Sequence, residues 1–132
     1  MTSSALPCLT FEGSAEAAMR FYVSLFPDSA IVSIERYGAH EQGAIGSVKR
    51  ARFTLCGRTF MCIDSAVKQD FTFTPSISIF VELDDEAILD RAFRELADGG
   101  KVFMPPGDYG FSVKFAWLSD RFGVSWQLSL VA

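Results

Sequence analysis

Two halves of the chain repeat the same sequence patterns in the same order, and this repeat limits the possible folds more than any other feature. The matches are EA at 16–17 and 86–87, SVK at 47–49 and 112–114, and Gly57 with Gly123. They lie roughly 65 to 71 residues apart, a self-similarity that indicates two copies of one structural unit. We therefore expect an internal duplication of a unit of about 65 residues.

Each half also predicts the element order β-α-β-β-β. In the first half, apolar residues at helical spacing cover 15–26, with Ser14 as the expected N-cap and Pro27 as the end. The strand-like segments of this half are 7–12, 30–37, 47–55 and 60–65. In the second half, we expect a helix from the acidic residues 84–87 to Gly99, because glycine favours a helix stop. The strand-like segments there are 76–83, 101–106, 111–119 and 124–130.

This pattern predicts an α+β fold built from two βαβββ modules. A βαβββ unit has a one-sided sheet that cannot hide its inner face alone, so we expect the modules to form a cupped mixed sheet around a shared concavity. The modules are expected at about 5–65 and 76–131, joined by the connector 66–75, within a single domain of residues 1–132. Any pocket is expected in the concavity.

Charge and composition exclude several classes of function. Twelve basic residues against sixteen acidic ones give a net charge of −4, which offers no positive surface for a nucleic-acid backbone. The chain has no basic and apolar leader and no apolar run near eighteen residues, so we expect a cytoplasmic protein without a membrane partner. Cys8, Cys56 and Cys62 are odd in number and lack CxxC spacing, which favours reduced thiols buried as small hydrophobic residues.

Three stretches carry a resemblance to a known family: LTFEGSAEAAMRFYVSLFPDS near the start, GSVKRARFTLCGRTFMCIDS with FTFTPSISIFVEL in the middle, and WLSDRFGVSWQLSL near the end. The chain resembles the vicinal oxygen chelate superfamily, which includes glyoxalase I, extradiol dioxygenases and bleomycin-resistance proteins, and more closely its PhnB-like branch. The resemblance implies a glyoxalase-like fold and a homodimer. Some relatives carry a 3-demethylubiquinone methyltransferase label, but this chain has no glycine-rich nucleotide loop after its first strand and is too short for the usual methyltransferase domain.

The resemblance also implies where a metal would bind. In metal-dependent members, a His or Gln early in each module and a Glu on each last strand hold a divalent ion. The expected positions here are Pro7 or Cys8, Met61, Ile77 or Ser78, and Gln127 in the place of a glutamate. None of these residues is His or Glu, so we expect no metal and no other cofactor, with Asp64 as the one nearby carboxylate that could supply a ligand.

Gln127 is the most informative of the candidate residues. A period of two places Trp126 and Leu128 on one face of the last strand and Gln127 on the other. A buried amide needs hydrogen-bond partners, which could be a polar ligand, ordered water or neighbouring strand groups. The full set of pocket-lining candidates is Cys8, Met61, Asp64, Ser78, Phe80, Trp117 and Gln127.

Other polar residues have simpler interpretations. Lys49 and Lys114, in the two SVK copies, could reach an anionic ligand, but alternating strand lysines usually face solvent. His40 and Glu41 are expected to form a solvated loop pair. Asp120 is expected to be a turn residue.

Three functions remain open. The first is a metal-free pocket protein that binds a small molecule. The second is a metal-dependent lyase or dioxygenase of the glyoxalase type, with a relocated centre that uses Asp64 and Gln127. The third is a structural dimer with a filled core. Metal analysis of the purified protein separates the first from the second.

Overall fold

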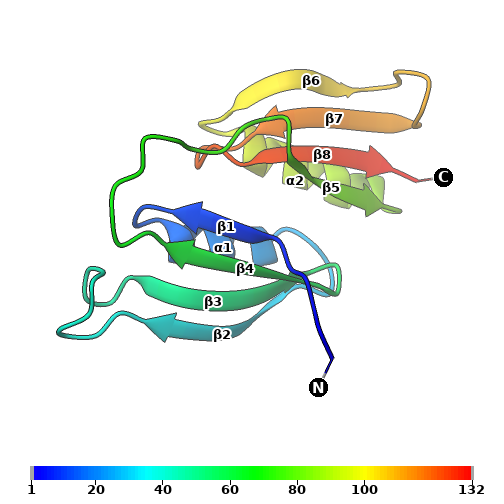
Figure 1. Ribbon diagram of the computed structural model, residues 1–132. Helices are drawn as coiled ribbons and strands as arrows, with labels where there is room; N and C mark the ends of the chain where they lie inside the picture. The colour runs from blue at the N-terminus through cyan, green and yellow to red at the C-terminus, as the bar shows by residue number, and fades with distance from the viewer. Residues whose placement is uncertain (1, 132) are drawn as a thin grey trace. The chain divides into compact units, whose positions relative to one another are not determined.

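The computed structural model describes residues 2–131, which form two compact units. Unit 1 runs up to Asp70, and unit 2 starts at Phe71. Each unit contains one helix and one four-stranded sheet in the order β-α-β-β-β (Figure 1). The duplicated α+β organisation predicted from the repeat is therefore confirmed.

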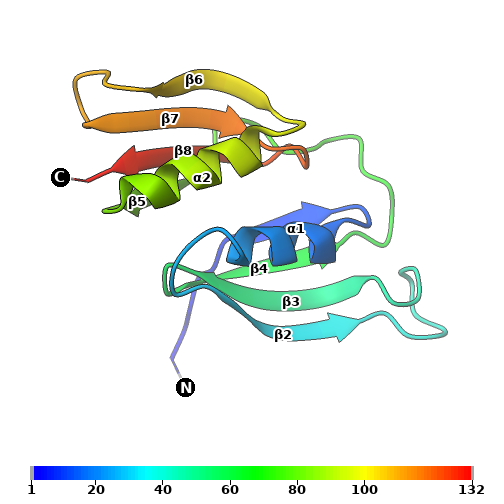
Figure 2. The ribbon, with the colours of Figure 1, turned by 180° about the vertical axis from the view of Figure 1, so that it is seen from behind.

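Unit 1 has its helix on one face of its sheet (Figure 2). Its elements are β1 (Cys8–Phe11), α1 (Ala15–Val23), β2 (Ala30–Arg36), β3 (Val48–Leu55) and β4 (Arg58–Asp64). The strand order is β1-β4-β3-β2, in which β1 is parallel to β4 and the other neighbours are antiparallel. The loop between β2 and β3 extends beyond the ends of these strands (Figure 1).

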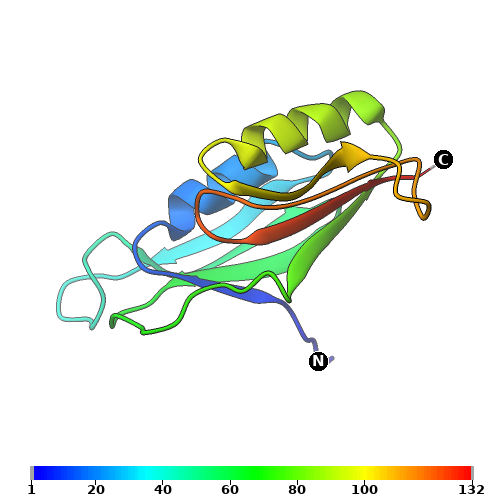
Figure 3. The ribbon, with the colours of Figure 1, turned by 90° about the horizontal axis from the view of Figure 1, so that it is seen from above.

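Unit 2 repeats this arrangement. Its elements are β5 (Ser78–Leu83), α2 (Glu86–Ala97), β6 (Lys101–Gly107), β7 (Lys114–Ser119) and β8 (Ser125–Leu130). The strand order is β5-β8-β7-β6, again with one parallel pair, β5 with β8. Figure 3 shows α2 lying along its sheet, and Figure 2 shows that it covers one face only.

Helix α1 is shorter than its sequence pattern predicts. It ends at Val23, with Ser24 as the C-cap, rather than at residue 26, because the N–H groups of Ser24 and Leu25 donate to the carbonyls three residues back and the α-helical bonding stops there. The face of α1 that packs against the sheet is fully buried and consists of Ala15, Ala18, Met19 and Tyr22. Its strand partners in the core of unit 1 are Phe11, Ala51, Phe53, Phe60 and Cys62.

Helix α2 packs its apolar stripe on the sheet of unit 2. Leu89, Ala92 and Leu96 are fully buried, while Ile88 and Phe93, which the helical spacing also assigns to the stripe, lie at its half-buried margin. The covered face of the sheet supplies Val81, Leu83, Ala116, Leu118, Trp126 and Leu128. Burial of each such aliphatic or aromatic side chain stabilises the unit by about 1.5–3 kcal/mol before chain entropy is counted.

Matching glycines confirm that the two units are copies. Gly57 lies between β3 and β4 with φ of 81°, and Gly123 lies between β7 and β8 with φ of 91°. Residues with side chains rarely adopt this left-handed conformation, so the same requirement selects glycine at both turns. No helix among residues 2–131 has the length and apolar character needed to cross a membrane.

Candidate functional site

The sheet face of unit 2 that α2 does not cover carries the polar candidates, and we call it the open face of unit 2. Strand pairing arranges its side chains in three rows across β5, β8 and β7. The rows are Ser78–Ser125–Ser119, Phe80–Gln127–Trp117 and Glu82–Ser129–Phe115. The opposite face carries Trp126 and Leu128, as the period-2 argument predicted.

A hydrogen-bonded cluster forms at the start of β5 and β8. Gln127 Nε2 donates to Ser78 Oγ at 3.2 Å, and Ser78 Oγ lies 2.6 Å from Ser125 Oγ. Trp117 Nε1 donates to the same Ser125 Oγ at 2.9 Å. The amide of Gln127 thus bonds to a neighbouring strand, which is one of the partners considered from the sequence, and its Oε1 atom accepts no hydrogen bond from residues 2–131.

Aromatic rings continue the open face on both sides of this cluster. The ring centroids of Phe103 and Trp117 are 5.1 Å apart, and those of Phe80 and Phe115 are 6.2 Å apart. Phe80 remains 53% exposed. A few polar groups placed among aromatic rings are typical of sites that bind small organic molecules.

Unit 1 presents different chemistry on its uncovered face. Met61, four residues beyond Gly57, takes the place that Gln127 has in unit 2. Its neighbours in register are Cys8 on β1 and Arg52 on β3. Cys8 and Met61 therefore lie side by side, but among residues 2–131 no hydrogen-bonded cluster like that of Gln127 forms around them.

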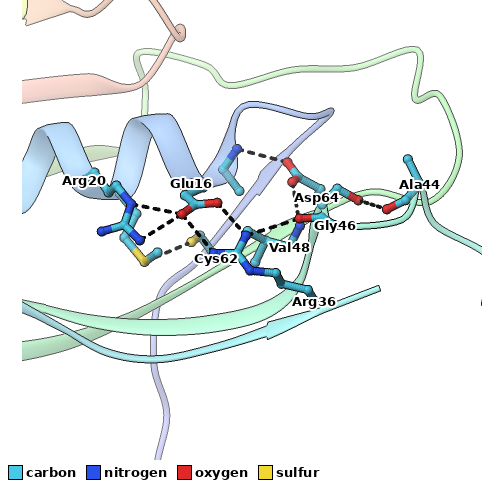
Figure 4. A network of polar contacts seen from close by, with 11 residues as sticks. Glu16, Arg20, Arg36, Ala44, Gly46, Val48, Cys62 and Asp64 are labelled. Carbon is cyan, nitrogen blue, oxygen red and sulfur yellow. Dashed lines mark hydrogen bonds and ion pairs between the residues drawn. The ribbon is translucent and has the colours of Figure 1, made fainter. Parts of the chain in front are cut away.

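Asp64 lies on the helix-covered side of its sheet, where it serves the fold of unit 1 (Figure 4). Its Oδ1 atom accepts backbone N–H bonds from Gly13 at 2.8 Å and Ala15 at 3.0 Å, and Oδ2 accepts one from Val48 at 2.9 Å. The side chain is buried, with 3% exposure. Both carboxylate oxygens are therefore already used to hold the start of α1 and the start of β3.

The residues at the implied metal positions do not fit a divalent ion. Met61 pairs in register with Cys8, and Gln127 pairs in register with Phe80. The hydroxyl of Ser78 accepts a hydrogen bond from the Gln127 amide. These groups offer a thioether, a thiol, a hydroxyl and an amide rather than the imidazoles and carboxylates that such ions need. Within residues 2–131, no three His, Cys, Asp or Glu side chains lie close enough together to hold a metal ion.

The cysteines differ from the sequence prediction of buried thiols. Cys62 is buried, and burial, together with the nearby Cys8 and Asp64, raises its pKa to about 12. Cys8 and Cys56 are exposed, so the prediction is wrong for these two. Cys8 lies on the uncovered side of edge strand β1, and Cys56 lies in the turn before Gly57, where there is no core to enclose them.

Both SVK lysines have intramolecular partners that the sequence did not indicate. Lys114 Nζ lies 2.6 Å from Asp90 and 3.1 Å from Glu86, both on α2. The hydrogen bonds that the ammonium group of Lys114 donates, first to Asp90 and second to Glu86, raise the pKa of Lys114. Lys49 pairs with Glu41 of the β2–β3 loop, which in turn accepts the backbone N–H of Gly38, whereas His40 is exposed in that loop.

An open depression at the other end of the open face of unit 2 was missed by the sequence argument. It has a volume of about 560 Å³. Glu82, Ser129 and Phe111 lie along its wall, together with Asp108 and Ser112. Only the positions of Glu82 and Ser129 on the outer sides of their strands could have indicated it, because the loop residues have no periodic pattern.

A family model and a solved relative carry the same family description. The family model described as 3-demethylubiquinone-9 3-methyltransferase matches residues 3–129. A PhnB protein from Bacillus cereus, with the same methyltransferase description, is 51% identical, with 98% of this chain and 100% of that chain covered and a TM-score of 0.94. A protein from Pseudomonas aeruginosa is 26% identical, with 98% of both chains covered and a TM-score of 0.83.

More distant structures share the fold alone. A mutant of the fosfomycin resistance protein FosX from Listeria monocytogenes, solved with Mn(II) and 1S,2S-dihydroxypropylphosphonic acid, is 11% identical. The comparison covers 100% of this chain and 94% of that chain, with a TM-score of 0.63. No curated protein matches the chain.

Proposed function

This chain belongs to the PhnB-like branch of the vicinal oxygen chelate family and has its glyoxalase-like fold, and we propose that it binds a small molecule on the open face of unit 2 without a metal ion. The observation that carries the proposal is the Gln127–Ser78–Ser125–Trp117 cluster, which lies beside the exposed ring of Phe80 and the half-buried ring of Phe103. A ligand with a polar group would bond to the free end of the Gln127 amide, and its apolar part would contact Phe80 and Trp117.

The donor chemistry supports binding without a metal. Gln127 carries no charge where a metal-dependent relative has a glutamate, and Asp64 already accepts three backbone N–H groups. A lyase or dioxygenase of the glyoxalase type would need the charged ligands that these positions lack. We therefore keep the metal-dependent alternative only as an outcome of the test.

Methyl transfer, which the family description names, is not part of the proposal. The loop between β1 and α1 is only Glu12-Gly13-Ser14, and it is not the glycine-rich loop of a dinucleotide-binding fold. Neither sheet is the open parallel sheet on which such domains build their cofactor site.

The test is a fragment screen by ligand-observed NMR, followed by mapping of backbone amide shifts. Hits are expected to perturb β5, β7 and β8, and Gln127→Leu should weaken them about tenfold or more, since it removes a polar partner from a half-buried site. Gln69→Leu is the matched control, because Gln69 Nε2 also donates to a serine, Ser65, but lies in the connector of unit 1. Hits that bind Gln127→Leu and the parent protein equally well would contradict the proposal.

We also propose that the protein is a cytoplasmic homodimer. Edge strand β5 exposes Phe80, and Ile77 just before it is 73% exposed, which leaves apolar surface beside unpaired backbone groups. The three cysteines are free thiols, as a reducing compartment favours. Sedimentation velocity over a range of concentrations tests the dimer, and a monomer at every concentration would exclude it.

A further inference from the structure

The depression at the end of the open face of unit 2 is lined by two carboxylates and an aromatic ring. Glu82 stands at the end of β5, next in register to Ser129 on β8. Asp108 lies in the β6–β7 loop, and Phe111 lies three residues further along the same loop. Glu82 and Asp108 are the charged residues among those that line the depression, and both are acidic.

The aromatic side of the depression is preorganised. The ring of Phe111 packs edge-on against Phe115 at 4.8 Å and lies 6.4 Å from the ring of Tyr109. The hydroxyl of Tyr109 donates to the carbonyl of Pro105 at 2.5 Å, which holds the loop against β6. Phe111 nevertheless remains 64% exposed, so a ring held by its neighbours is available to a ligand.

The carboxylates are available as well. The side-chain carboxylate of Glu82 makes no hydrogen bond or ion pair with residues 2–131, and Asp108 uses one carboxylate oxygen, Oδ1, to accept the backbone N–H of Gly110 at 2.8 Å. Lys114 follows the lining residue Val113 in sequence, but Asp90 and Glu86 of α2 already hold its ammonium group. The negative charge of the depression is therefore not neutralised by the adjacent lysine.

We propose that this depression binds an organic cation, an ammonium group that carries an apolar body, between Glu82, Asp108 and the ring of Phe111. Carboxylates attract the ammonium group, and an aromatic face attracts a cation through its quadrupole. The volume of about 560 Å³ falls in the range of small-molecule sites. The inference rests on the proposed function, since Phe80 and Phe115 connect this end of the open face to the Gln127 cluster, and it adds the charge of the ligand.

The test compares benzyltrimethylammonium with neutral benzyl alcohol and anionic phenylacetate by NMR titration of the full chain. The cation should bind more tightly than either analogue, perturb amides of 108–113 and 129–131, and weaken as salt is raised. Glu82→Gln, Asp108→Asn and Phe111→Leu should each weaken binding about two- to fivefold, the size expected of exposed charge and cation–π contacts. Asp108→Asn keeps the oxygen that accepts from Gly110, so the loop is preserved.

Glu95→Gln on the exposed side of α2 is the matched control and should leave the affinity unchanged. The inference is overturned if the cation does not bind, if the uncharged or anionic analogue binds equally well, or if the three variants have no effect. If fragments still bind the parent protein more tightly than Gln127→Leu in that case, the proposed function is left intact. If fragments bind Gln127→Leu and the parent protein equally well, the proposed function is contradicted instead.

Discussion

Asp64 and Asp120 are the two buried carboxylates among residues 2–131, and each holds backbone N–H groups of its own unit. The carboxylate of Asp120 accepts hydrogen bonds from the backbone N–H groups of Phe122 and Val124 and from the indole N–H of Trp126. Asp120 is therefore a turn residue, as predicted, and it also contacts the buried Trp126. A charged acceptor stabilises such bonds more than a neutral one. At the scale of the residue, the acidic side chains therefore fall into two groups. Asp64 and Asp120 are buried and stabilise the fold, whereas others, such as Glu82 and Asp108, are exposed at the surface.

We predict that Asp64→Asn destabilises the protein by about 2 kcal/mol, because the amide NH₂ group would face one of the three backbone donors and leave it unpaired. Chemical denaturation measures the change in the free energy of unfolding. Asp70→Asn, at an exposed position of the same unit, is the control and should have almost no effect. Equal stability of the two variants would mean that the carboxylate of Asp64 is not needed for the fold.

Thiol reactivity should separate the three cysteines. Cys8 and Cys56 are exposed, whereas Cys62 is buried with a pKa raised to about 12, so it remains a protonated thiol at neutral pH. Iodoacetamide at pH 8 should label Cys8 and Cys56 in the native protein and Cys62 only after denaturant is added. Peptide mass spectrometry measures the labelling, and early modification of Cys62 would contradict its position in the core.

At the scale of the element, the two helices begin in different ways. Asp85 caps α2 with its own side chain, which accepts from Ala87 and Ile88. Ser14 stands at the same position of α1 but makes no such bond, and Asp64 from β4 accepts the N–H of Ala15 instead. The prediction of Ser14 as N-cap is right for its position and wrong for its side-chain bond.

Asp85→Ala should therefore cost about 1 kcal/mol of stability, while Ser14→Ala should change it by only a few tenths. The pair serves as its own control, because both substitutions remove a polar group at the start of a helix. Denaturant titration of the two variants beside the parent protein measures the difference. A larger loss in Ser14→Ala would show that α1 depends on its own cap.

A network of charges ties α1 to β2. Glu16 Oε1 lies 2.5 Å from Arg36 NH1, and its Oε2 accepts from Arg20 at 2.9 Å (Figure 4). Hydrogen bonds from Arg36 first, then Arg20, lower the pKa of Glu16 from 4.5 to about 2. A lowered pKa in the folded state stabilises the protein at pH values above 4.5, and that stabilisation is lost as the pH falls toward 2.

Glu16→Gln should accordingly melt below the parent protein at pH 7, and the gap in melting temperature should close between pH 4.5 and 2. The gap itself should be small, because the groups are near the surface and screened by solvent. Calorimetric melts at pH 7, 4 and 3 measure it, with Glu95→Gln as the exposed control. A gap that is constant over this range would rule out the ionised network.

At the scale of the whole molecule, the two copies have diverged in what their open sheet faces carry. Unit 1 presents Cys8, Met61 and Arg52, whereas unit 2 presents the Gln127 cluster and aromatic rings. The same strand arrangement thus carries two different surfaces, and within residues 2–131 only that of unit 2 combines a hydrogen-bonded amide cluster with aromatic rings. The single domain and the shared concavity expected from the sequence remain predictions.

Removal of divalent metal should leave the protein unchanged. We expect dialysis against EDTA to shift the melting temperature by less than about 1 °C, since a bound metal that is removed would lower it. Elemental analysis of the purified protein should find no divalent metal in a one-to-one ratio. Stoichiometric metal that is lost in Asp64→Ala or Gln127→Ala would establish the metal-dependent alternative.

The sequence by itself determined the duplicated element order, the glycine turns and the faces of the strands, because periods of two and 3.6 residues and turn chemistry are local properties. The sequence also placed Gln127 on the face of its strand that Trp126 and Leu128 do not occupy. It showed that neither His nor Glu stands at the positions where the resemblance implies metal ligands. The tertiary structure decided which groups meet across long separations: Asp64 with Gly13 is 51 residues apart, and Gln127 with Ser78 is 49. Strand order and register, which no local pattern contains, bring these groups together, and the same holds for Glu82 and the loop that carries Asp108 and Phe111.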